Sequence, residues 1–150
     1  MGGYGGSSRK GKSSYYLDTG GKKVTDRNAI LVGEYYIQQG NYVAFLQEKH
    51  GQKRADLSVE GIHIEVKGMT STSTNKIANT IKEAFEQVSA DDYRYPPSTN
   101  RPGKVVILLK HSNVREGYKS ITGGFRKAKN KGYVSGQVEL WYNEKIIVLN

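Results

Sequence analysis

Two carboxylates and a lysine lie close together in residues 54–67, which read R-A-D-L-S-V-E-G-I-H-I-E-V-K. Apolar and polar residues alternate on both sides of Glu60-Gly61, a pattern typical of a β-hairpin with a two-residue turn. In such a hairpin Asp56 lies opposite Glu65, and Lys67 follows on the same face. Because two facing acids repel each other, this arrangement suits a divalent cation with a nearby water.

The same hairpin divides its residues between two faces. Its register pairs Val59 with Ile62, Ser58 with His63, Leu57 with Ile64 and Asp56 with Glu65. The five apolar side chains, with Val66 as the fifth, then share one face, and the polar side chains share the other. An antiparallel sheet commonly keeps one face in water, so the simpler interpretation is a solvated polar face that holds no metal.

Length and composition indicate one soluble domain. At 150 residues with 36% hydrophobic residues, the chain is long enough for a single core. It contains no cysteine, which excludes disulfides and thiolate metal sites. No apolar run is long enough for a membrane span and no signal-peptide pattern opens the chain, so we expect action in a reducing cytoplasm.

Positive charge is strong and unevenly distributed. The formal net charge is +9, and residues 101–131 contain nine Lys or Arg and one acid, Glu116. Concentrated positive charge is typical of proteins that bind polyanions, although solubility or an acidic protein partner would also fit. The candidate nucleic-acid-binding residues are Lys110, Arg115, Lys119, Arg126, Lys127, Lys129 and Lys131.

The remaining pattern predicts an α/β fold with a mixed central sheet flanked by helices. In chain order we expect a helix over 25–39, a strand over 42–47, the hairpin, a helix over 75–88, a strand over 105–109, partial helix over 113–131 and a hairpin over 138–149. Gly123-Gly124 weakens the third helix and predicts a break there. Residues 1–20 are expected to be a flexible, basic Gly/Ser-rich leader, followed by one domain over 21–150.

One further acid stands out in the first helix. Glu34 falls on a stripe with Ile30 and Ile37 at helical spacing, where a carboxylate is costly unless it has a partner. It lies either at the wet edge of the stripe or in a functional site. On the second helix, Gln87 borders the apolar face and is able to reach a neighbouring polar group.

A helix with an inward Glu, three strands carrying Asp and Glu-x-Lys, and then a helix and a strand resemble the PD-(D/E)XK nuclease superfamily. The matching residues are Glu34, Asp56 and Glu65-Val66-Lys67, within residues 25–110; Ala55 replaces the usual proline before the aspartate. The resemblance implies an α-β-β-β-α-β core with an additional C-terminal helix and hairpin.

The resemblance also implies a metal-dependent nuclease, that is, a phosphodiester hydrolase. Asp56 and Glu65, with Glu34, would hold Mg²⁺, Mn²⁺ or Zn²⁺, and Lys67 would assist the attacking water. Gln87 matches a polar position often found on the second core helix of this superfamily.

Within the superfamily the chain looks most like nuclease toxin domains at the C-terminus of contact-dependent growth inhibition proteins. The segments G-I-H-I-E-V-K, N-K-I-A-N-T-I-K-E-A-F-E-Q and K-V-V-I-L-L, with the basic tail, carry this likeness. It implies transfer RNA as a substrate in preference to DNA, and delivery within a larger secreted toxin to the target-cell cytoplasm. It also implies a cognate acidic immunity protein.

Three alternatives stay open. Holliday-junction resolvases of the archaeal type share the Glu, Asp and Glu-x-Lys pattern and cleave DNA. A non-catalytic, basic nucleic-acid-binding module would leave the acids on a solvated face. A metal-free ribonuclease would use His50, His63 or His111, of which His63 shares the hairpin face with Glu65.

Overall fold

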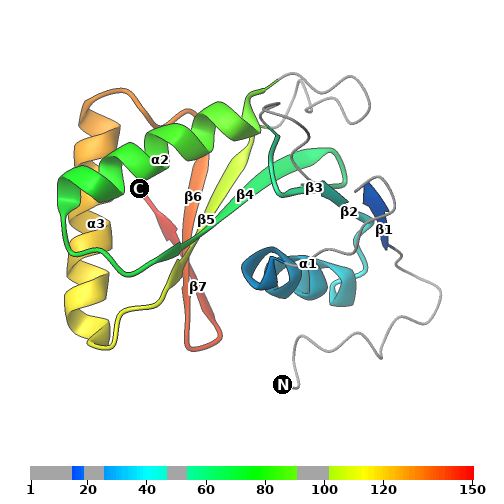
Figure 1. The fold of residues 1–150 in the computed structure, drawn as a ribbon, viewed down its shortest axis with the longest axis horizontal. Coiled ribbons are helices and arrows are strands. Elements are labelled where there is room, and N and C mark those ends of the chain that lie inside the picture. Colours follow the sequence, from blue (N-terminus) through cyan, green and yellow to red (C-terminus); the bar gives the residue numbers. More distant parts are fainter. Residues whose placement is uncertain (1–14, 19–25, 47–53, 91–101) are drawn as a thin grey trace.

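A computed structural model of the chain describes residues 15–18, 26–46, 54–90 and 102–150. Seven strands form one mixed sheet, and their order in space follows their order in the sequence (Figure 1). The strands are β1 (Tyr15–Asp18), β2 (Val43–Leu46), β3 (Leu57–Val59), β4 (Ile62–Met69), β5 (Lys104–Leu109), β6 (Gln137–Tyr142) and β7 (Lys145–Leu149). The helices are α1 (Arg27–Gln38), α2 (Thr74–Val88) and α3 (Val114–Asn130).

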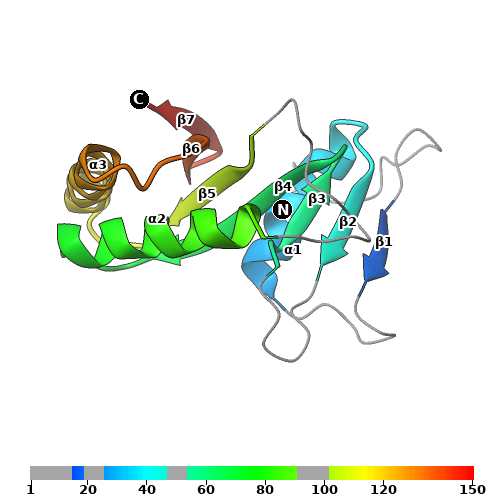
Figure 2. The same ribbon diagram turned by 90° about the horizontal axis from the view of Figure 1, so that it is seen from above.

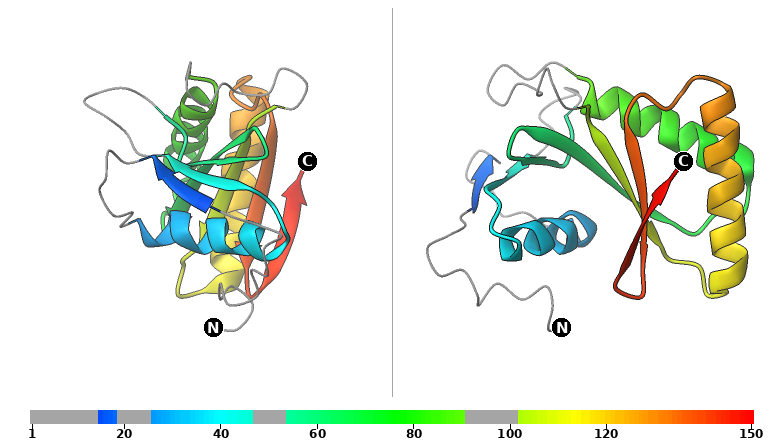
Figure 3. Two further views of the ribbon diagram at one scale, coloured as in Figure 1. Left: turned by 90° about the vertical axis from the view of Figure 1, so that its right-hand side faces the viewer. Right: turned by 180° about the vertical axis from the view of Figure 1, so that it is seen from behind.

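Helices cover both faces of the sheet. The parallel pairs β4–β5 and β5–β6 are joined through α2 and α3, which pack on the same face in one core cluster with β5 and β6. Helix α1 packs on the opposite face against β2, β3 and β4 in a second cluster. Figure 2 shows α2 lying along the sheet with α3 beside one end, and Figure 3 shows the twisted sheet between α1 and the other two helices. The expected α/β class with a mixed, flanked sheet is therefore confirmed.

The predicted register of the central hairpin is confirmed for its three strand pairs. Leu57 pairs with Ile64, Ser58 with His63 and Val59 with Ile62. Both turn residues lie in the left-handed region, with φ of 50° at Glu60 and 85° at Gly61. Such dihedrals match the twist of a two-residue hairpin turn, which explains why the glycine sits there. The final hairpin is also confirmed, with Tyr142 paired to Lys145 across Asn143-Glu144.

Strand β4 is longer than its neighbour β3 and extends beyond it, and the candidate site lies where the pairing of the two strands ends. The pairing of β3 with β4 ends at Leu57 and Ile64, whereas β4 continues to Met69 and pairs with β5 on its other side. From Glu65 onward, one edge of β4 therefore has no pairing with β3. Asp56 lies directly at the point where the two strands part.

Two expectations need correction at element ends. Helix α1, expected from residue 25, begins after Asp26, whose carboxylate accepts hydrogen bonds from the N–H groups of Asn28 and Ala29. The leader expected over residues 1–20 includes strand β1, which pairs in parallel with β2. Gln47, to which the strand β2 (Val43–Leu46) was expected to extend, lies outside the described residues.

The expected break at Gly123-Gly124 is wrong, because α3 runs without interruption from Val114 to Asn130. Gly124 is buried where α3 meets α2, and a β-carbon there would overlap the side chain of Ile77. Gly123 is half-buried, and its β-carbon would approach only a Thr74 methyl group, at 3.1 Å. The glycine pair thus permits close helix packing rather than a break.

We predict opposite outcomes for alanine at these two neighbours. Gly124→Ala forces α3 away from Ile77 and lowers the free energy of unfolding by about 2 kcal/mol, as overpacking does. Gly123→Ala raises the helix propensity of α3, which stabilises the fold by up to about 1 kcal/mol. The new methyl group contacts the Thr74 methyl closely, but a small shift of the threonine side chain relieves this contact. Urea denaturation of both variants tests this difference; equal stability would contradict the packing role of Gly124.

Candidate functional site

Hydrogen bonds hold Asp56 and Glu65 together at the edge of β4 that extends beyond β3 and that we call the free edge. The N–H of Asp56 donates to Glu65 Oε1 at 3.1 Å, and the N–H of Val66 donates to Asp56 Oδ2 at 2.9 Å. A carboxylate oxygen thus takes the place that a β3 carbonyl would occupy if the strand pairing continued. The two carboxyl groups also lie within hydrogen-bonding reach of each other. The predicted meeting of these two acids is therefore borne out by the geometry.

The polar face of the hairpin is buried rather than solvated. Ser58, His63 and Glu65 are only 7%, 2% and 3% exposed, and they lie on the face of the sheet that α2 covers. The interpretation of these residues as an ordinary wet face is therefore wrong. Removing a carboxylate from water is costly, so Glu65 is retained there against a considerable desolvation penalty.

Burial changes the proton affinity of both acids. Burial, with a further contribution from the neighbouring Asp56 carboxylate, raises the pKa of Glu65 to about 8 although Lys67 opposes the rise. Burial likewise raises the pKa of Asp56 to about 6, against the lowering effect of the hydrogen bond from Val66. At neutral pH the pair therefore shares about one proton, because two adjacent buried charges repel each other.

Lys67 supplies the positive charge at this site. Its Nζ lies 3.2 Å from Glu65 Oε2, and its side chain is 28% exposed whereas that of Glu65 is 4% exposed. Two residues further along β4 from Glu65, it points to the same face as that acid, as the hairpin pattern predicts. The ammonium group thus contacts both a buried carboxylate and solvent, which places it where an incoming anion would arrive.

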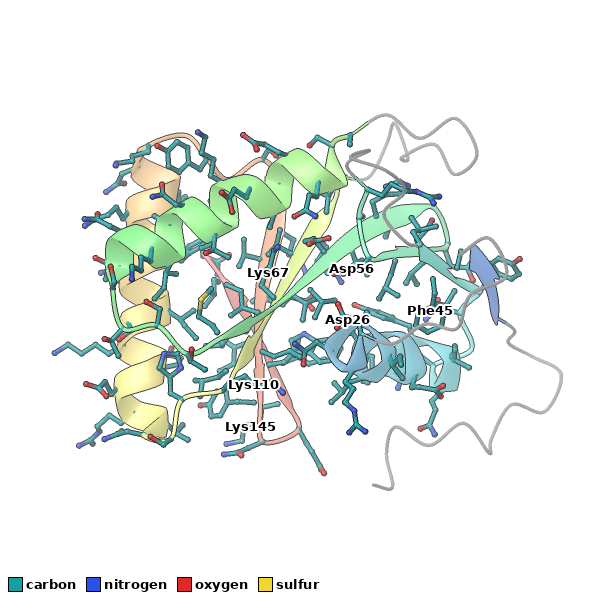
Figure 4. The ribbon with its side chains drawn as sticks, viewed as in Figure 1. Asp26, Phe45, Asp56, Lys67, Lys110 and Lys145 are labelled. Carbon is teal, nitrogen blue, oxygen red and sulfur yellow. The ribbon has the colours of Figure 1, made fainter. Side chains whose placement is uncertain are left out.

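The acid of α1 that affects Asp56 is Asp26. Its negative charge raises the pKa of Asp56, so the N-terminus of α1 lies near the acid pair. The side-chain amide of Asn28, the second residue of α1, lies against Gly68 of β4. Figure 4 shows Asp26, Asp56 and Lys67 near the centre of the view, where α1 begins close to β4.

Within the described residues, Glu34 does not join Asp56 and Glu65 in a group of three acids that could hold a metal ion. The buried side of α1 consists of Ala29, Val32, Gly33 and Ile37, not of the expected Ile30–Glu34–Ile37 stripe. A β-carbon at Gly33 would overlap the Phe45 ring, so the helix turns its glycine toward β2. Glu34 consequently lies half-buried at the edge of the packed stripe. Gly33 is the signal in the sequence for this orientation of α1, because a glycine within a helix allows the helix to pack closely on a neighbouring element.

Within the described residues, neither Gln87 nor His111 has a hydrogen bond to Asp56 or Glu65. Gln87 is half-buried in the last turn of α2, and within the described part of the chain no hydrogen bond links its amide to Asp56 or Glu65. His63 is buried two residues before Glu65, and His111 Nε2 hydrogen-bonds to the carbonyl of Ser71 at 2.7 Å. His50 lies outside the described residues.

The basic residues separate into two groups. Four exposed residues of α3 fall on one side of the helix at spacings of four, seven and three, and we call them the α3 basic stripe: Arg115, Lys119, Arg126 and Lys129. Lys131 is exposed just after the helix. Lys127 is instead half-buried, and its Nζ donates to Thr74 and Asn75 at the start of α2. Lys110 is exposed at the end of β5.

A second acid–lysine pair lies on the opposite face of the sheet and was missed from the sequence. Lys104 Nζ is 3.1 Å from Glu139 Oε2 and donates to Tyr36 Oη at 2.9 Å. Glu139 also accepts from the side chains of Gln137 and Trp141, at 2.6 and 3.0 Å. This pair is fully provided with hydrogen-bond partners, as buried structural ion pairs require. It gives a matched structural counterpart to Glu65 and Lys67.

The donor set at the acid pair suits a small, hard cation. Among the described residues there is no group of three or more His, Cys, Asp or Glu that could hold a metal ion, so Asp56 and Glu65 stand as two carboxylates. Mg²⁺ is commonly bound by one or two carboxylates, with water and substrate phosphate completing its coordination, whereas Zn²⁺ usually has three or four protein ligands. The residues present therefore fit Mg²⁺ or Mn²⁺ better than Zn²⁺.

The fold and site define an α/β protein with a buried acid pair and an adjacent lysine at a free strand edge. Searches against protein-family models, curated proteins and solved structures found no match to this chain. Within the described residues, no helix is both long and apolar enough to cross a membrane.

Proposed function

We propose that this protein is a metal-dependent nuclease of the PD-(D/E)XK kind, hydrolysing phosphodiester bonds. The observation that supports it most is the convergence of Asp56, Glu65 and Lys67 at the free edge of β4. A purely structural acid pair would be expected to carry enough donors to neutralise it, as Glu139 does. Asp56 and Glu65 instead have raised pKa values, and a divalent cation would relieve their repulsion.

Each residue of the site has a distinct role in this proposal. Asp56 and Glu65 would hold the divalent cation, which when bound supplies positive charge to the phosphate and lowers the pKa of a water. The backbone N–H groups of Asp56 and Val66 fix the two carboxylates before any ligand arrives. Lys67, held by Glu65 and open to solvent, positions the attacking water and stabilises charge that develops on the phosphate.

The substrate class in this proposal is nucleic acid, with transfer RNA preferred over DNA. The net charge of +9 and the α3 basic stripe supply the attraction that a polyanion requires. We further propose that the chain acts as an interbacterial toxin domain, delivered within a larger protein to the target-cell cytoplasm. A cognate immunity protein with an acidic surface would then complement the same positive charge.

The decisive experiment incubates the purified protein with total transfer RNA, plasmid DNA and a four-way DNA junction, each with Mg²⁺, Mn²⁺, Zn²⁺ or a chelator. Cleavage of transfer RNA that requires Mg²⁺ or Mn²⁺ and stops with chelator is the expected result. Selective cutting of the junction would favour the resolvase-like alternative. Tight, chelator-insensitive binding without cleavage of any substrate would instead identify a non-catalytic binding module and reject the nuclease.

The α3 basic stripe gives a separate prediction about binding. Replacing Arg115, Lys119, Arg126 and Lys129 together by glutamine should weaken RNA affinity by about 10- to 100-fold near physiological salt. The variant contacts fewer phosphates, so fewer counterions are released from the RNA when it binds. The slope of log affinity against log salt should fall by about 2 to 3. Fluorescence anisotropy with labelled RNA measures both quantities. Lys82→Gln, an exposed change on α2, serves as the control and should leave the slope nearly unchanged.

A further inference from the structure

A cavity of about 310 Å³ opens at the carboxyl ends of the parallel strands β5 and β6. Leu31 of α1 and Leu108 of β5 contribute apolar walls, and Trp141 of β6 lines the cavity between them and the β6–β7 turn. The carboxyl ends of parallel strands are a frequent position for ligand sites in α/β sheets. The volume lies at the lower end of the range for ligand pockets, which suits one small planar ring system rather than a polymer.

The rim of this cavity is polar and carries both signs of charge. Lys110 and Lys145 lie on it, together with Asn143 and Glu144 from the turn. Asn143 and Glu144 both have left-handed backbones, with φ of 50° and 59°, so the turn has the fixed shape of a tight hairpin. An amide and a carboxylate on a rigid turn suit recognition of the hydrogen-bonding edge of a base, and the two lysines suit the attached phosphates.

The cavity meets β4 on the face of the sheet that α1 covers, whereas Glu65 and Lys67 point to the face that α2 covers. The side chain of Lys110 packs beside Gly68, within 3.6 Å of where a β-carbon would stand, and its N–H donates to the carbonyl of Met69 at 2.9 Å. Gly68 directly follows Lys67 and lies three residues after Glu65, about 10 Å along an extended strand. Figure 4 shows Lys110 and Lys145 below Lys67 and Asp56 in the same view.

We propose that this cavity is a base-recognition subsite, which binds one nucleobase of the nucleic-acid substrate. This inference rests on the proposed nuclease function. Trp141 and the leucines contact the apolar ring, Lys110 and Lys145 contact phosphates, and Glu144 accepts a hydrogen bond from an exocyclic amino group. Because uracil has no amino group, bases that carry one are preferred over uracil at this position.

Binding to the cavity is measurable without any cleavage, because Trp141 is the only tryptophan in the chain. The full-length protein, with no metal added, is titrated with AMP, CMP, GMP and UMP while tryptophan fluorescence is recorded. We expect saturable quenching by at least one amino-bearing nucleotide, with a dissociation constant at least fivefold below that of UMP. Inorganic phosphate and ribose 5-phosphate should not reproduce the quenching.

Glu144→Gly is the sharpest variant for this test. It creates an Asn-Gly pair, which a tight hairpin turn favours, so the hairpin keeps its shape while the carboxylate is removed. The dissociation constants of UMP and of the preferred nucleotide should then differ by less than twofold. Lys82→Ala, a charge change on α2 outside both the cavity and the α3 basic stripe, is the control and should keep the difference in dissociation constant. Sequencing of cleavage products should likewise show a base preference that Glu144→Gly relaxes.

The outcomes separate this inference from the function on which it rests. Equal quenching by all four nucleotides, or by inorganic phosphate, would overturn base recognition even if the protein cleaves RNA. Discrimination among nucleotides with no cleavage of any substrate would reject the nuclease and leave the cavity as a nucleotide site. A change in Trp141 fluorescence caused only by an acidic protein partner, with no response to nucleotides, would also overturn the inference.

Discussion

Glu65→Gln is expected to lower the rate of nucleic-acid cleavage by about 10³-fold or more, a loss of roughly 4 kcal/mol of transition-state stabilisation. Glutamine keeps the size of the side chain and can still accept the hydrogen bond from the N–H of Asp56. It removes the negative charge that is needed to hold a divalent cation and to orient Lys67. Single-turnover cleavage of labelled RNA at saturating Mg²⁺ measures the loss.

Glu139→Gln is the matched control, since it also neutralises a buried glutamate that contacts a lysine in the same sheet. Glu139 faces the opposite side, so cleavage should remain within about threefold of the wild-type rate although the free energy of unfolding falls. The Glu65→Gln protein should keep its binding affinity for RNA, because the α3 basic stripe is unchanged. Full cleavage activity in Glu65→Gln would refute the catalytic assignment.

The metal-free protein is expected to lose about 2 to 4 kcal/mol of unfolding free energy as pH rises from 5 to 9. A carboxyl group whose pKa is raised by folding binds its proton more tightly in the native state, so it stabilises the fold at low pH. That contribution is lost as pH rises through the folded value, which is about 6 for Asp56 and about 8 for Glu65. Each pKa unit corresponds to about 1.4 kcal/mol, and the shared proton keeps the total below the simple sum.

Two comparisons test this origin of the pH dependence. Chemical denaturation at several pH values should give a much flatter profile for Glu65→Gln, because the group with the highest pKa no longer titrates. Millimolar Mg²⁺ at pH 8.5 should restore stability to the wild-type protein and have little effect on Glu65→Gln, since ligands that bind only the folded state stabilise it. An unfolding free energy that rises between pH 6 and pH 9 without metal would contradict the raised pKa values.

The local elements were largely predictable from the sequence. Alternation around Glu60-Gly61 predicted the hairpin and its register, and the helix predicted over 75–88 is α2, which buries Ile77, Ile81 and Phe85. These features depend on neighbours a few residues apart, so the pattern of side chains determines them. The meeting of Asp56 with Glu65 belongs to this group, because it follows from the hairpin alone.

Other features were decided only by how the helices pack on the sheet. Helix α2 covers the polar face of the hairpin and buries it, and the close approach of Gly33 to Phe45 decides which side of α1 packs on the sheet. The bond between Tyr36 and Lys104 joins residues 68 positions apart, which no local pattern predicts. The sequence by itself therefore determined which two acids face each other. The tertiary structure decided their burial and their neighbours, because those depend on contacts between elements distant in the chain.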